Sequence, residues 1–349
     1  MNARKVAVLG ATGVVGQRFL RLLDGHPWFR VAEVVASDGR RGKPYGEAVP
    51  WLDRGDPQDA VRDLELKGPD DDLDADLVFS ALPSGTAGPL ERSLAARGFA
   101  VFTNAADLRM EEDVPIVVPE VNPEHLSLAE DQRVRNAGGG FVVANGNCTA
   151  ILLSLALKPL RDRFGLRACH VVTLQALSGA GYPGVPGLDA LGNVLPYIPQ
   201  EEGKVESEPQ KILGTAQEGR IVRASFPLSA TCMRVPVLEG HTEAVTVRLE
   251  EEASADEIRE TLRAFRGRPQ ALGLPSAPRA PLVYRDEADR PQPRRDGPEG
   301  GGMTVAVGRL RPDPILGWKF VVAGSNTVRG AAGGSILTAE LALASGLLS

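Results

Sequence analysis

A short apolar segment near the N-terminus runs directly into a turn built on three evenly spaced glycines. Residues 6–9, Val-Ala-Val-Leu, form the kind of run expected for a strand that is covered on both faces. Gly10, Gly13 and Gly16 come next, and the apolar spacing of residues 17–23 predicts a helix. A buried strand that passes through a glycine turn into a helix is the opening unit of a parallel sheet with helical crossovers. This feature therefore restricts the N-terminal part of the chain to an α/β fold.

The same alternation of strand and helix continues as far as residue 144. The strands expected after the first are residues 31–36, 76–81, 99–103, 116–118 and 141–144. Because helical segments separate these runs, we expect parallel strands with right-handed crossovers. We predict a doubly wound parallel-sheet domain, α/β in class, over residues 1–147.

The pattern changes after this sheet. Apolar and polar residues alternate in residues 244–250 and 303–310, which is typical of antiparallel strands with one face turned to solvent or to a partner. Residues 267–300 are rich in Pro, Arg, Asp and Gly and are predicted to form a long ordered loop. We therefore predict an α+β domain with a mostly antiparallel sheet over residues 148–325. The helix of the C-terminal segment, residues 326–349, is expected to pack back on the first domain.

Composition and charge exclude several classes of protein. The 349 residues carry a net charge of −6, whereas nucleic acids and membrane surfaces call for a basic face. The apolar stretches at 151–157 and 336–348 are too short or too mixed to span a bilayer, which needs roughly 20 apolar residues. Three cysteines without a CxxC pair indicate neither a disulfide framework nor a metal site. The first strand leaves no room for a signal peptide, so we expect a cytoplasmic protein.

The glycine turn is a candidate dinucleotide site. Its GxxGxxG spacing differs from the commoner GxGxxG, but both provide a tight turn and helix amides aimed at a pyrophosphate. A structural turn without a ligand is the alternative interpretation. The residues expected to contact the cofactor here are Gly10, Thr12, Gly13, Val14, Val15 and Gly16.

Polar residues at the end of the second predicted strand bear on the choice of cofactor. Ser37, Arg40 and Arg41 lie where the adenosine ribose is expected, and a hydroxyl with two guanidinium groups suits a 2′-phosphate. This favours NADP. Asp38 keeps NAD as the alternative, since a carboxylate there would accept the ribose 2′-hydroxyl.

Cys148 lies between a short apolar strand, residues 141–144, and an apolar helix at 151–160. Unpaired amides and the dipole at a helix N-terminus favour a thiolate, so we expect the pKa of Cys148 to fall well below about 8.5. Most free cysteines only pack in cores, and this is how we interpret Cys169 and Cys232. Cys148 is therefore the candidate nucleophile.

A nucleophilic cysteine needs a base, and four histidines are available. His241 follows Gly240 at the end of an apolar segment, where turns often carry functional groups on a rigid scaffold. The others occupy segments typical of structural or solvated residues: His26, His125 and His170. The residues whose charge suits an anionic substrate are Arg109, Lys211 and Arg234. Glu208 and Lys211 are also spaced as a simple pair on a helix surface.

Taken together, these segments resemble the aspartate-semialdehyde dehydrogenase family, especially its archaeal and fungal branch. The similarity extends over nearly the whole chain. Its motifs are GATGVVGQRF from residue 10, NAADLRMEEDVPIVVPEVNPEH from 104, NGNCTAILLSLALKPL from 145, QALSGAGYPGVPGLDALGNVLPYI from 175, EPQKILG from 208, RVPVLEGHTE from 234, RDEADRPQPR from 285 and NTVRGAAGGSILTAEL from 326.

The resemblance implies a role for each matching residue. Cys148 would be the nucleophile, His241 the acid–base catalyst, and Gln175 would orient the acyl intermediate. Ser178, Gly179 and Asn326 would lie near the nicotinamide of NADPH. The second domain would be both catalytic and a dimerisation domain, giving a homodimer or homotetramer.

The substrate would be held at both of its ends. Arg234 would bind the α-carboxylate, Glu208 the ammonium, and Arg109 and Lys211 the phosphate. The family often has Asn-Ala-Ser-Ser before the arginine, whereas this chain has Asn-Ala-Ala-Asp at 104–107 and carries neither serine hydroxyl.

The implied reaction is the reversible NADPH-dependent reduction of aspartyl phosphate to aspartate semialdehyde and phosphate, in lysine, threonine and methionine biosynthesis. The main alternative is a malonyl-CoA reductase, which would not need Glu208 as an ammonium acceptor. N-acetylglutamyl-phosphate reductase shares the chemistry without these motifs. The remaining alternatives are a non-catalytic nucleotide-binding protein and a cysteine hydrolase. Intact Cys148, His241 and Gln175 argue against the former, and the glycine turn argues against the latter.

Overall fold

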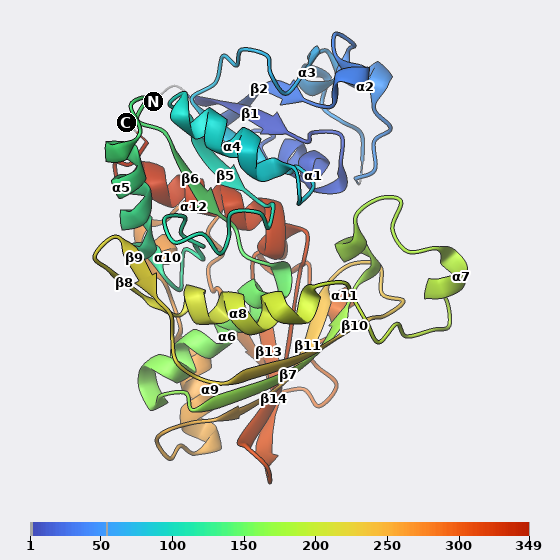
Figure 1. Ribbon diagram of the computed structural model, residues 1–349. Coiled ribbons are helices and arrows are strands. Elements are labelled where there is room, and N and C mark those ends of the chain that lie inside the picture. The colour runs from blue at the N-terminus through green and yellow to red at the C-terminus, as the bar shows by residue number, and fades with distance from the viewer. Residues whose placement is uncertain (1–2, 54, 349) are drawn as a thin grey trace.

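The computed structural model describes residues 3–53 and 55–348, without the side chain of Asp38. Two six-stranded sheets divide most of the chain between them. The first sheet, coloured blue to green, lies at the top of Figure 1, and the second lies below it. In the described part of the chain, no helix has the length and apolar character needed to cross a membrane.

The first sheet is entirely parallel, with strand order β3-β2-β1-β4-β5-β6. Its strands are β1 (Arg4–Leu9), β2 (Phe29–Val35), β3 (Leu66–Lys67), β4 (Leu77–Ser80), β5 (Ala100–Thr103) and β6 (Phe141–Ala144). Every residue of β4, β5 and β6 is buried, as the short apolar runs predicted. The doubly wound sheet is therefore confirmed. The strand predicted at 116–118 is reduced to one bridge, between Ile116 and Ala144.

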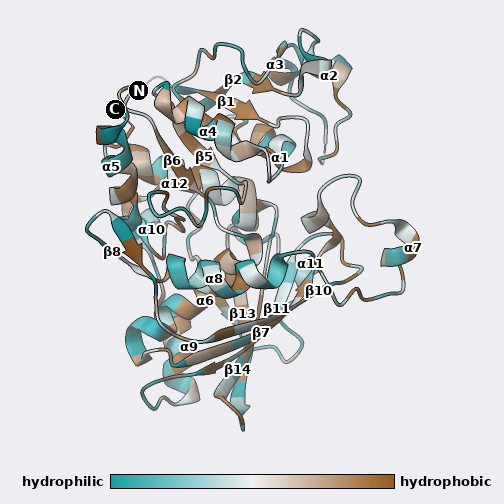
Figure 2. Cartoon of the chain, viewed as in Figure 1, coloured by the Kyte–Doolittle hydropathy of each residue, from teal (hydrophilic) through white to brown (hydrophobic). Residues whose placement is uncertain are grey.

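Helices cover both faces of this sheet (Figure 1). They are α1 (Val14–Leu22), α2 (Tyr45–Ala48), α3 (Asp59–Arg62), α4 (Ala87–Ala96), α5 (Ser127–Arg135) and α12 (Gly333–Ala344). The last of them returns from the far end of the chain. Ile336 and Leu337 of α12 belong to the same buried core as Val8 and Phe79. In Figure 2, β1 and β2 are brown, which marks the apolar centre of this domain.

The second sheet has the order β10-β7-β11-β14-β13-β12. Its strands are β7 (Ala168–Gln175), β10 (Leu228–Arg234), β11 (His241–Arg248), β12 (Leu282–Arg285), β13 (Val305–Asp313) and β14 (Gly317–Gly324). The central pairings are antiparallel, and the two edge strands, β10 and β12, are parallel to their neighbours. The predicted mostly antiparallel sheet is confirmed.

One face of the second sheet is covered and the other is open. The helices and small strands of this half are α6 (Cys148–Phe164), α7 (Gly187–Ala190), α8 (Glu201–Ile212), β8 (Thr215–Gln217), β9 (Arg220–Val222), α9 (Ala255–Ala264), α10 (Arg268–Leu272) and α11 (Pro293–Asp296). Buried and partly exposed residues alternate strictly along β7. This alternation is the mark of a sheet with one packed face.

The prediction of a long loop at 267–300 is wrong in part. Residues 282–285 form edge strand β12, and α10 and α11 lie on either side of it. The carboxylate of Asp296 accepts hydrogen bonds from Arg285 Nε at 2.9 Å and Arg290 Nε at 2.8 Å, which folds this segment on itself. Strand β12 has only four residues, too few to show a clear alternation in the sequence. It forms because the neighbouring strand, β13, supplies its hydrogen-bond partners.

Candidate active site

Cys148 is the first residue of α6, directly after the residue that caps the helix. The side-chain Oδ1 of Asn147 accepts hydrogen bonds from the backbone N–H groups of Thr149 at 3.0 Å and Ala150 at 3.1 Å. This N-cap explains why the helix starts here. Behind the cysteine, a Cβ at Gly330 would lie 2.5 Å from Cys148 Cβ, so only glycine fits at that position.

His241, the first residue of β11, reaches the candidate nucleophile. Its Nε2 lies 3.2 Å from Cys148 Sγ. Its Nδ1 faces the backbone N–H of Ala176 at 3.1 Å and accepts a hydrogen bond from it. Because Nδ1 is an acceptor, the proton of the neutral ring is on Nε2 and points toward the sulfur. The sequence could not establish this contact, since 93 residues separate the two side chains.

The resting thiol and imidazole are both neutral. Burial raises the pKa of Cys148 to about 12; Glu201 adds to the rise and Arg109 opposes it. Burial, helped by Arg234, lowers the pKa of His241 to about 3. The predicted low pKa of Cys148 is therefore wrong, because desolvation outweighs the favourable end of the helix.

Two neighbouring parallel strands bring further polar side chains to the same edge of the second sheet. Gln175 ends β7, Arg234 ends β10, and the two residues are paired in register. Arg234 Nη1 donates to the carbonyl oxygen of Ala176 at 2.7 Å, which fixes the guanidinium beside His241. A Cβ at Gly179 would lie 2.6 Å from Arg234 Nη1, so this glycine leaves room for the arginine.

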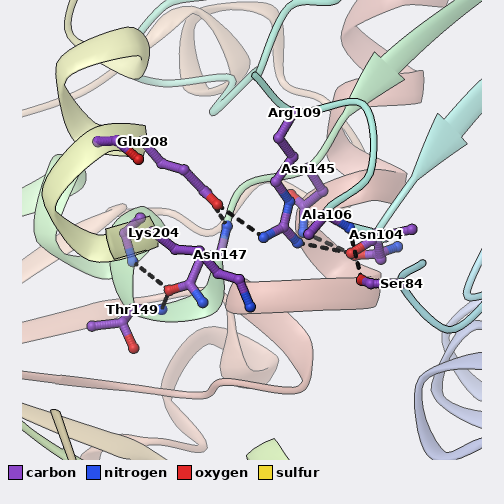
Figure 3. Close-up of polar contacts among 12 residues, drawn as sticks. Ser84, Asn104, Ala106, Arg109, Asn145, Asn147, Thr149, Lys204 and Glu208 are labelled. Carbon is purple, nitrogen blue, oxygen red and sulfur yellow. Dashed lines mark hydrogen bonds and ion pairs between the residues drawn. The ribbon is translucent and has the colours of Figure 1, made fainter. Parts of the chain in front are cut away.

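Helix α8 contributes a buried acid, Glu208, which lies beside Asn147 and Arg109 (Figure 3). Its Oε1 accepts from Arg109 Nη1 at 3.0 Å, and its Oε2 accepts from the backbone N–H of Asn147 at 2.5 Å. Arg109 also donates to the carbonyl oxygen of Asn104 at 2.8 Å. Arg109 is 7% exposed and Glu208 2%. Glu208 and Lys211 do not form the helix-surface pair that their spacing also allowed, because Lys211 is buried as well, at 3% exposed. A buried guanidinium and a buried carboxylate thus flank the nucleophile loop.

Lys211, one turn further along α8, holds the loop that carries Arg109. Its Nζ donates to the carbonyl oxygens of Arg109 at 2.7 Å, Glu111 at 2.7 Å and Val114 at 2.8 Å. An ammonium group has three N–H donors, and these contacts use all of them. Burial lowers the pKa of Lys211 to about 8. In this geometry Lys211 shapes the loop at 109–114.

Asp107, which stands in the place of the second serine, binds backbone amides at the start of α4. Its carboxylate accepts from the backbone N–H groups of Gly85 at 2.7 Å, Ala87 at 3.0 Å and Gly88 at 3.1 Å. These amides lower the pKa of Asp107 against the effect of burial. The substitution therefore couples the loop before Arg109 to the loop that follows β4.

The glycine turn fits a pyrophosphate because its backbone leaves no room for side chains. Gly10 has φ +68°, and a Cβ there would lie 2.5 Å from the carbonyl oxygen of Ala81. A Cβ at Gly16 would lie 2.2 Å from the carbonyl oxygen of Gly10. Gly13 caps α1, so the first amides of that helix face the turn. Thr12, Val14 and Val15 are half-buried in the same turn.

The other predicted cofactor contacts lie in two separate places. At the end of β2, Ser37 is exposed, Arg40 is half-buried and Arg41 forms an ion pair with Asp71. NAD was kept as the alternative because of Asp38, whose side chain lies outside the described part of the structure. On the second domain, Asn326 Nδ2 donates to Ser178 Oγ at 2.9 Å. Asn326 Oδ1 accepts from the backbone N–H of Gly240 at 2.9 Å, next to His241.

Sequence reasoning missed Glu201 and the cap residue Asn147. Glu201 accepts hydrogen bonds from the side chains of Asn147 at 2.8 Å and Gln175 at 3.0 Å. Its spacing of seven residues from Glu208 was the available signal, because residues two turns apart lie on one face of a helix. Among the described residues, no group of three or more His, Cys, Asp or Glu side chains could hold a metal ion.

A parallel sheet with a glycine turn, joined to a domain that presents a cysteine in contact with a histidine, defines a two-domain NAD(P)-dependent oxidoreductase. Two family models match this division: the NAD binding domain of semialdehyde dehydrogenase over residues 5–129, and its dimerisation domain over 157–329. The chain belongs to the aspartate-semialdehyde dehydrogenase family, as the motifs predicted. The matched dimerisation domain supports oligomer formation.

The individual relatives include aspartate-semialdehyde dehydrogenases and one enzyme of a different name. Aspartate-semialdehyde dehydrogenase from Archaeoglobus fulgidus is 50% identical over 96% of this chain and 97% of its own length. The crystal structure of the Candida albicans enzyme with NADP superposes with a TM-score of 0.92 at 40% identity, covering 99% of this chain and 100% of that one. A malonyl-CoA reductase (NADP) from Metallosphaera sedula is 39% identical over 99% of this chain and 98% of its own length.

Proposed function

We propose that this enzyme catalyses the reversible NADPH-dependent conversion of L-aspartyl 4-phosphate into L-aspartate 4-semialdehyde and phosphate. The observation that carries the proposal is the contact between Cys148 and His241, with Arg234 on one side and the buried Arg109–Glu208 pair on the other. A thiol can form an acyl intermediate, and the flanking charges match a substrate with anionic groups at both ends.

The Arg109–Glu208 pair is suited to a substrate that carries both a phosphate and an ammonium. In this proposal the phosphate binds the guanidinium of Arg109 and the ammonium takes its place on Glu208, so each buried charge exchanges one partner for another. Arg234 binds the α-carboxylate. Lys211 supports phosphate binding by holding the carbonyl groups of the loop at 109–114.

The chemical step begins at the Cys148 sulfur. A bond forms between sulfur and the acyl carbon, the bond from that carbon to the phosphate oxygen breaks, and the thiol proton leaves with phosphate. Gln175 orients the resulting thioester. In the second half of the reaction, His241 donates a hydrogen bond from its Nε2–H to the oxygen that gains charge. When the aldehyde forms and the sulfur leaves as a thiolate, a proton taken from solvent and passed through His241 restores the Cys148 thiol.

The cofactor that suits the described residues is NADP. When bound, it supplies the hydride that reduces the thioester. The amides after Gly10 hold the pyrophosphate; Ser37, Arg40 and Arg41 bind the 2′-phosphate, for which Arg41 leaves Asp71; and Ser178 with Asn326 lies beside the nicotinamide. Gly179, which is packed against Arg234 and His241, would lie near that ring.

We further propose that the enzyme is a cytoplasmic homodimer formed through the open face of the second sheet. Apolar side chains on this face keep part of their surface exposed: Val172, Leu174, Met233, Ala244 and Val321. The segment at 181–200 adds Tyr182, 70% exposed, and Leu188, 98% exposed. Such surfaces are typical of interaction sites. Sedimentation should give twice the mass of the chain; a monomer or a tetramer would contradict this arrangement. We keep 1–147 and 148–325 as the proposed domains, with 326–349 on the first.

A parallel assay with two substrates tests the reaction. With NADPH and purified enzyme, aspartyl phosphate should be reduced and malonyl-CoA should not. In the reverse direction, oxidation of aspartate semialdehyde should require phosphate and proceed faster with NADP than with NAD. Reduction of malonyl-CoA alone would instead support the alternative suggested by the Metallosphaera sedula relative.

A further inference from the structure

Glu201, at the start of α8, joins the two segments that meet at the nucleophile. The residue is 7% exposed. Its Oε1 accepts from Asn147 Nδ2 at 2.8 Å and from Gln175 Nε2 at 3.0 Å. Asn147 directly precedes Cys148, and Gln175 is the last residue of β7. One carboxylate oxygen therefore connects the loop that carries the thiol to the strand that carries the acyl-orienting amide.

The charge of Glu201 determines which way both amides face. An ionised carboxylate can only accept hydrogen bonds, so the amide nitrogens must point toward it. The second N–H of Gln175 donates to Thr173 Oγ1 at 3.3 Å, which leaves the amide oxygen of Gln175 for the acyl site. Asn147 likewise keeps its oxygen for the first-turn amides of α6.

Four charged or titratable groups act on the Cys148 thiol, each from a different segment. They are His241 from β11, Arg234 from β10, Arg109 from the loop after β5, and Glu201 from α8. Among these four, Glu201 is the acid. Its negative charge raises the pKa of Cys148, while Arg109 lowers it. The same residue thus influences both the geometry and the ionisation of the nucleophile.

We propose that Glu201 is a positioning residue for the covalent step, which fixes the amide of Gln175 and, through Asn147, the loop that carries Cys148. This inference rests on the proposed function, because the roles of Cys148 and Gln175 come from it. Glu201 acts through these neighbours and does not itself contact the reacting atoms. Glu208 holds the same loop through the backbone of Asn147, so α8 grips it at two points one heptad apart.

Two substitutions separate charge from geometry. Glu201→Gln removes the charge, which should lower the thiol pKa by about one unit. Roughly tenfold more of the thiol would then be ionised at pH 8, but a thiolate of lower pKa is a weaker nucleophile. We therefore expect Cys148 to be alkylated by iodoacetamide about threefold faster at this pH. Turnover should fall about tenfold or more, because a glutamine amide can present either its oxygen or its NH2 group to Gln175, so the orientation of Gln175 is no longer fixed. Glu201→Asp keeps the charge but shortens the reach, so turnover should fall while alkylation stays near the wild-type rate.

Glu202→Gln is the matched control. Glu202 is the next residue of α8, and its Oε1 accepts from the backbone N–H of Cys232 at 3.2 Å, away from Cys148. Both rates should be unchanged in this variant. Peptide mass spectrometry assigns the alkylation to Cys148 and separates it from Cys169 and Cys232.

Faster alkylation of Cys148 together with slower turnover identifies a positioning role only if the buried Cys169 and Cys232 stay unreacted, because general damage to the fold would expose all three thiols. Unchanged turnover, or an alkylation rate equal to or below that of the wild type, would overturn the proposal. Alkylation needs no substrate, so it reports on Glu201 even if the wild-type enzyme fails with aspartate semialdehyde and phosphate. That failure would count against the proposed reaction instead.

Discussion

The two sheets serve the proposed reaction in different ways. The first sheet contributes backbone: at Gly10 and Gly16 an added Cβ would meet carbonyl oxygens at 2.5 and 2.2 Å. The second sheet contributes side chains: Gln175, Arg234 and His241 stand at the ends of three neighbouring strands. The cofactor site therefore depends on the absence of side chains, and the catalytic site depends on their presence.

This difference predicts that each region can be damaged without the other. Several segments connect the regions: α6 starts at Cys148, with three residues between it and the end of β6, and α8 holds the loop between them through Glu201 and Glu208. Cofactor binding and thiol chemistry are still separable measurements. Substitutions in one region should leave the other region's measurement in place.

The largest expected effect comes from removing the nucleophile. Cys148→Ser should lower phosphate-dependent oxidation of aspartate semialdehyde at least about a thousandfold, because a hydroxyl is a far weaker nucleophile than a thiol beside this histidine. NADPH binding, measured by fluorescence titration, should be unchanged. Near-normal turnover in this variant would contradict the mechanism, and a loss of NADPH binding would contradict the separation of the two regions.

The converse substitution damages the backbone of the first sheet. Gly10→Ala places a Cβ where φ is +68° and the nearest carbonyl oxygen would be 2.5 Å away. Strain of about 1–3 kcal/mol is expected, with NADPH affinity falling roughly tenfold or more. Alkylation of Cys148 should continue at the wild-type rate.

Gly13→Ala is the control for this substitution, because its Cβ would lie 3.6 Å from its nearest neighbour, an ordinary contact. NADPH affinity should fall less in Gly13→Ala than in Gly10→Ala. Equal losses in the two variants would show that crowding at Gly10 is not the cause.

The smallest effect concerns a residue of the second sheet that the site does not use. Glu243 is fully buried on β11, and neither carboxylate oxygen has a hydrogen-bond partner among the described residues. Burial raises its pKa well above the ordinary value. The folded protein thus keeps a proton that the unfolded chain releases as pH rises above about 4.5, so this residue makes folding less favourable toward neutral pH.

Glu243→Met should therefore raise the free energy of unfolding by about 1–3 kcal/mol at pH 8, the usual cost of a buried polar group without a partner. The gain should be smaller at pH 5, where less of the unfolded chain is ionised at this position. Urea unfolding at both pH values measures the difference. Parallel stability profiles for wild type and variant would show that Glu243 does not titrate between the two states.

The sequence predicted the features that depend on residues close together in the chain, such as a buried strand, a tight turn or the start of a helix. The run at 6–9 and its three glycines predicted the first strand and turn, because burial on both faces and tight backbone approach need those residue types. Cys148 was predicted to lie at a helix start because an apolar strand precedes it and an apolar helix follows it in the sequence. The family resemblance then supplied His241 and Gln175 as partners, which no spacing rule could pair with a cysteine so far away in sequence.

What the sequence could not predict depends on contacts between distant segments. The thiol pKa rises because the residues packed around Cys148 desolvate the thiolate, although part of the cysteine stays exposed, and this effect outweighs that of the helix end. Lys211 has its three donors saturated by carbonyls about 100 residues away. Strand β12 exists because β13 lies beside it. Glu201 acquires its partners, Asn147 and Gln175, only when three segments that are distant in the sequence come together.

The central claim is that Cys148 accepts an aspartyl group, and capture of that intermediate tests it most directly. Enzyme is mixed with aspartyl phosphate in the absence of NADPH, quenched in acid and analysed by peptide mass spectrometry. The account predicts an aspartyl thioester on Cys148 and none on Cys169 or Cys232. This thioester should disappear when NADPH is added before the quench. An acyl group on another residue, or no covalent adduct while turnover proceeds normally, would contradict it.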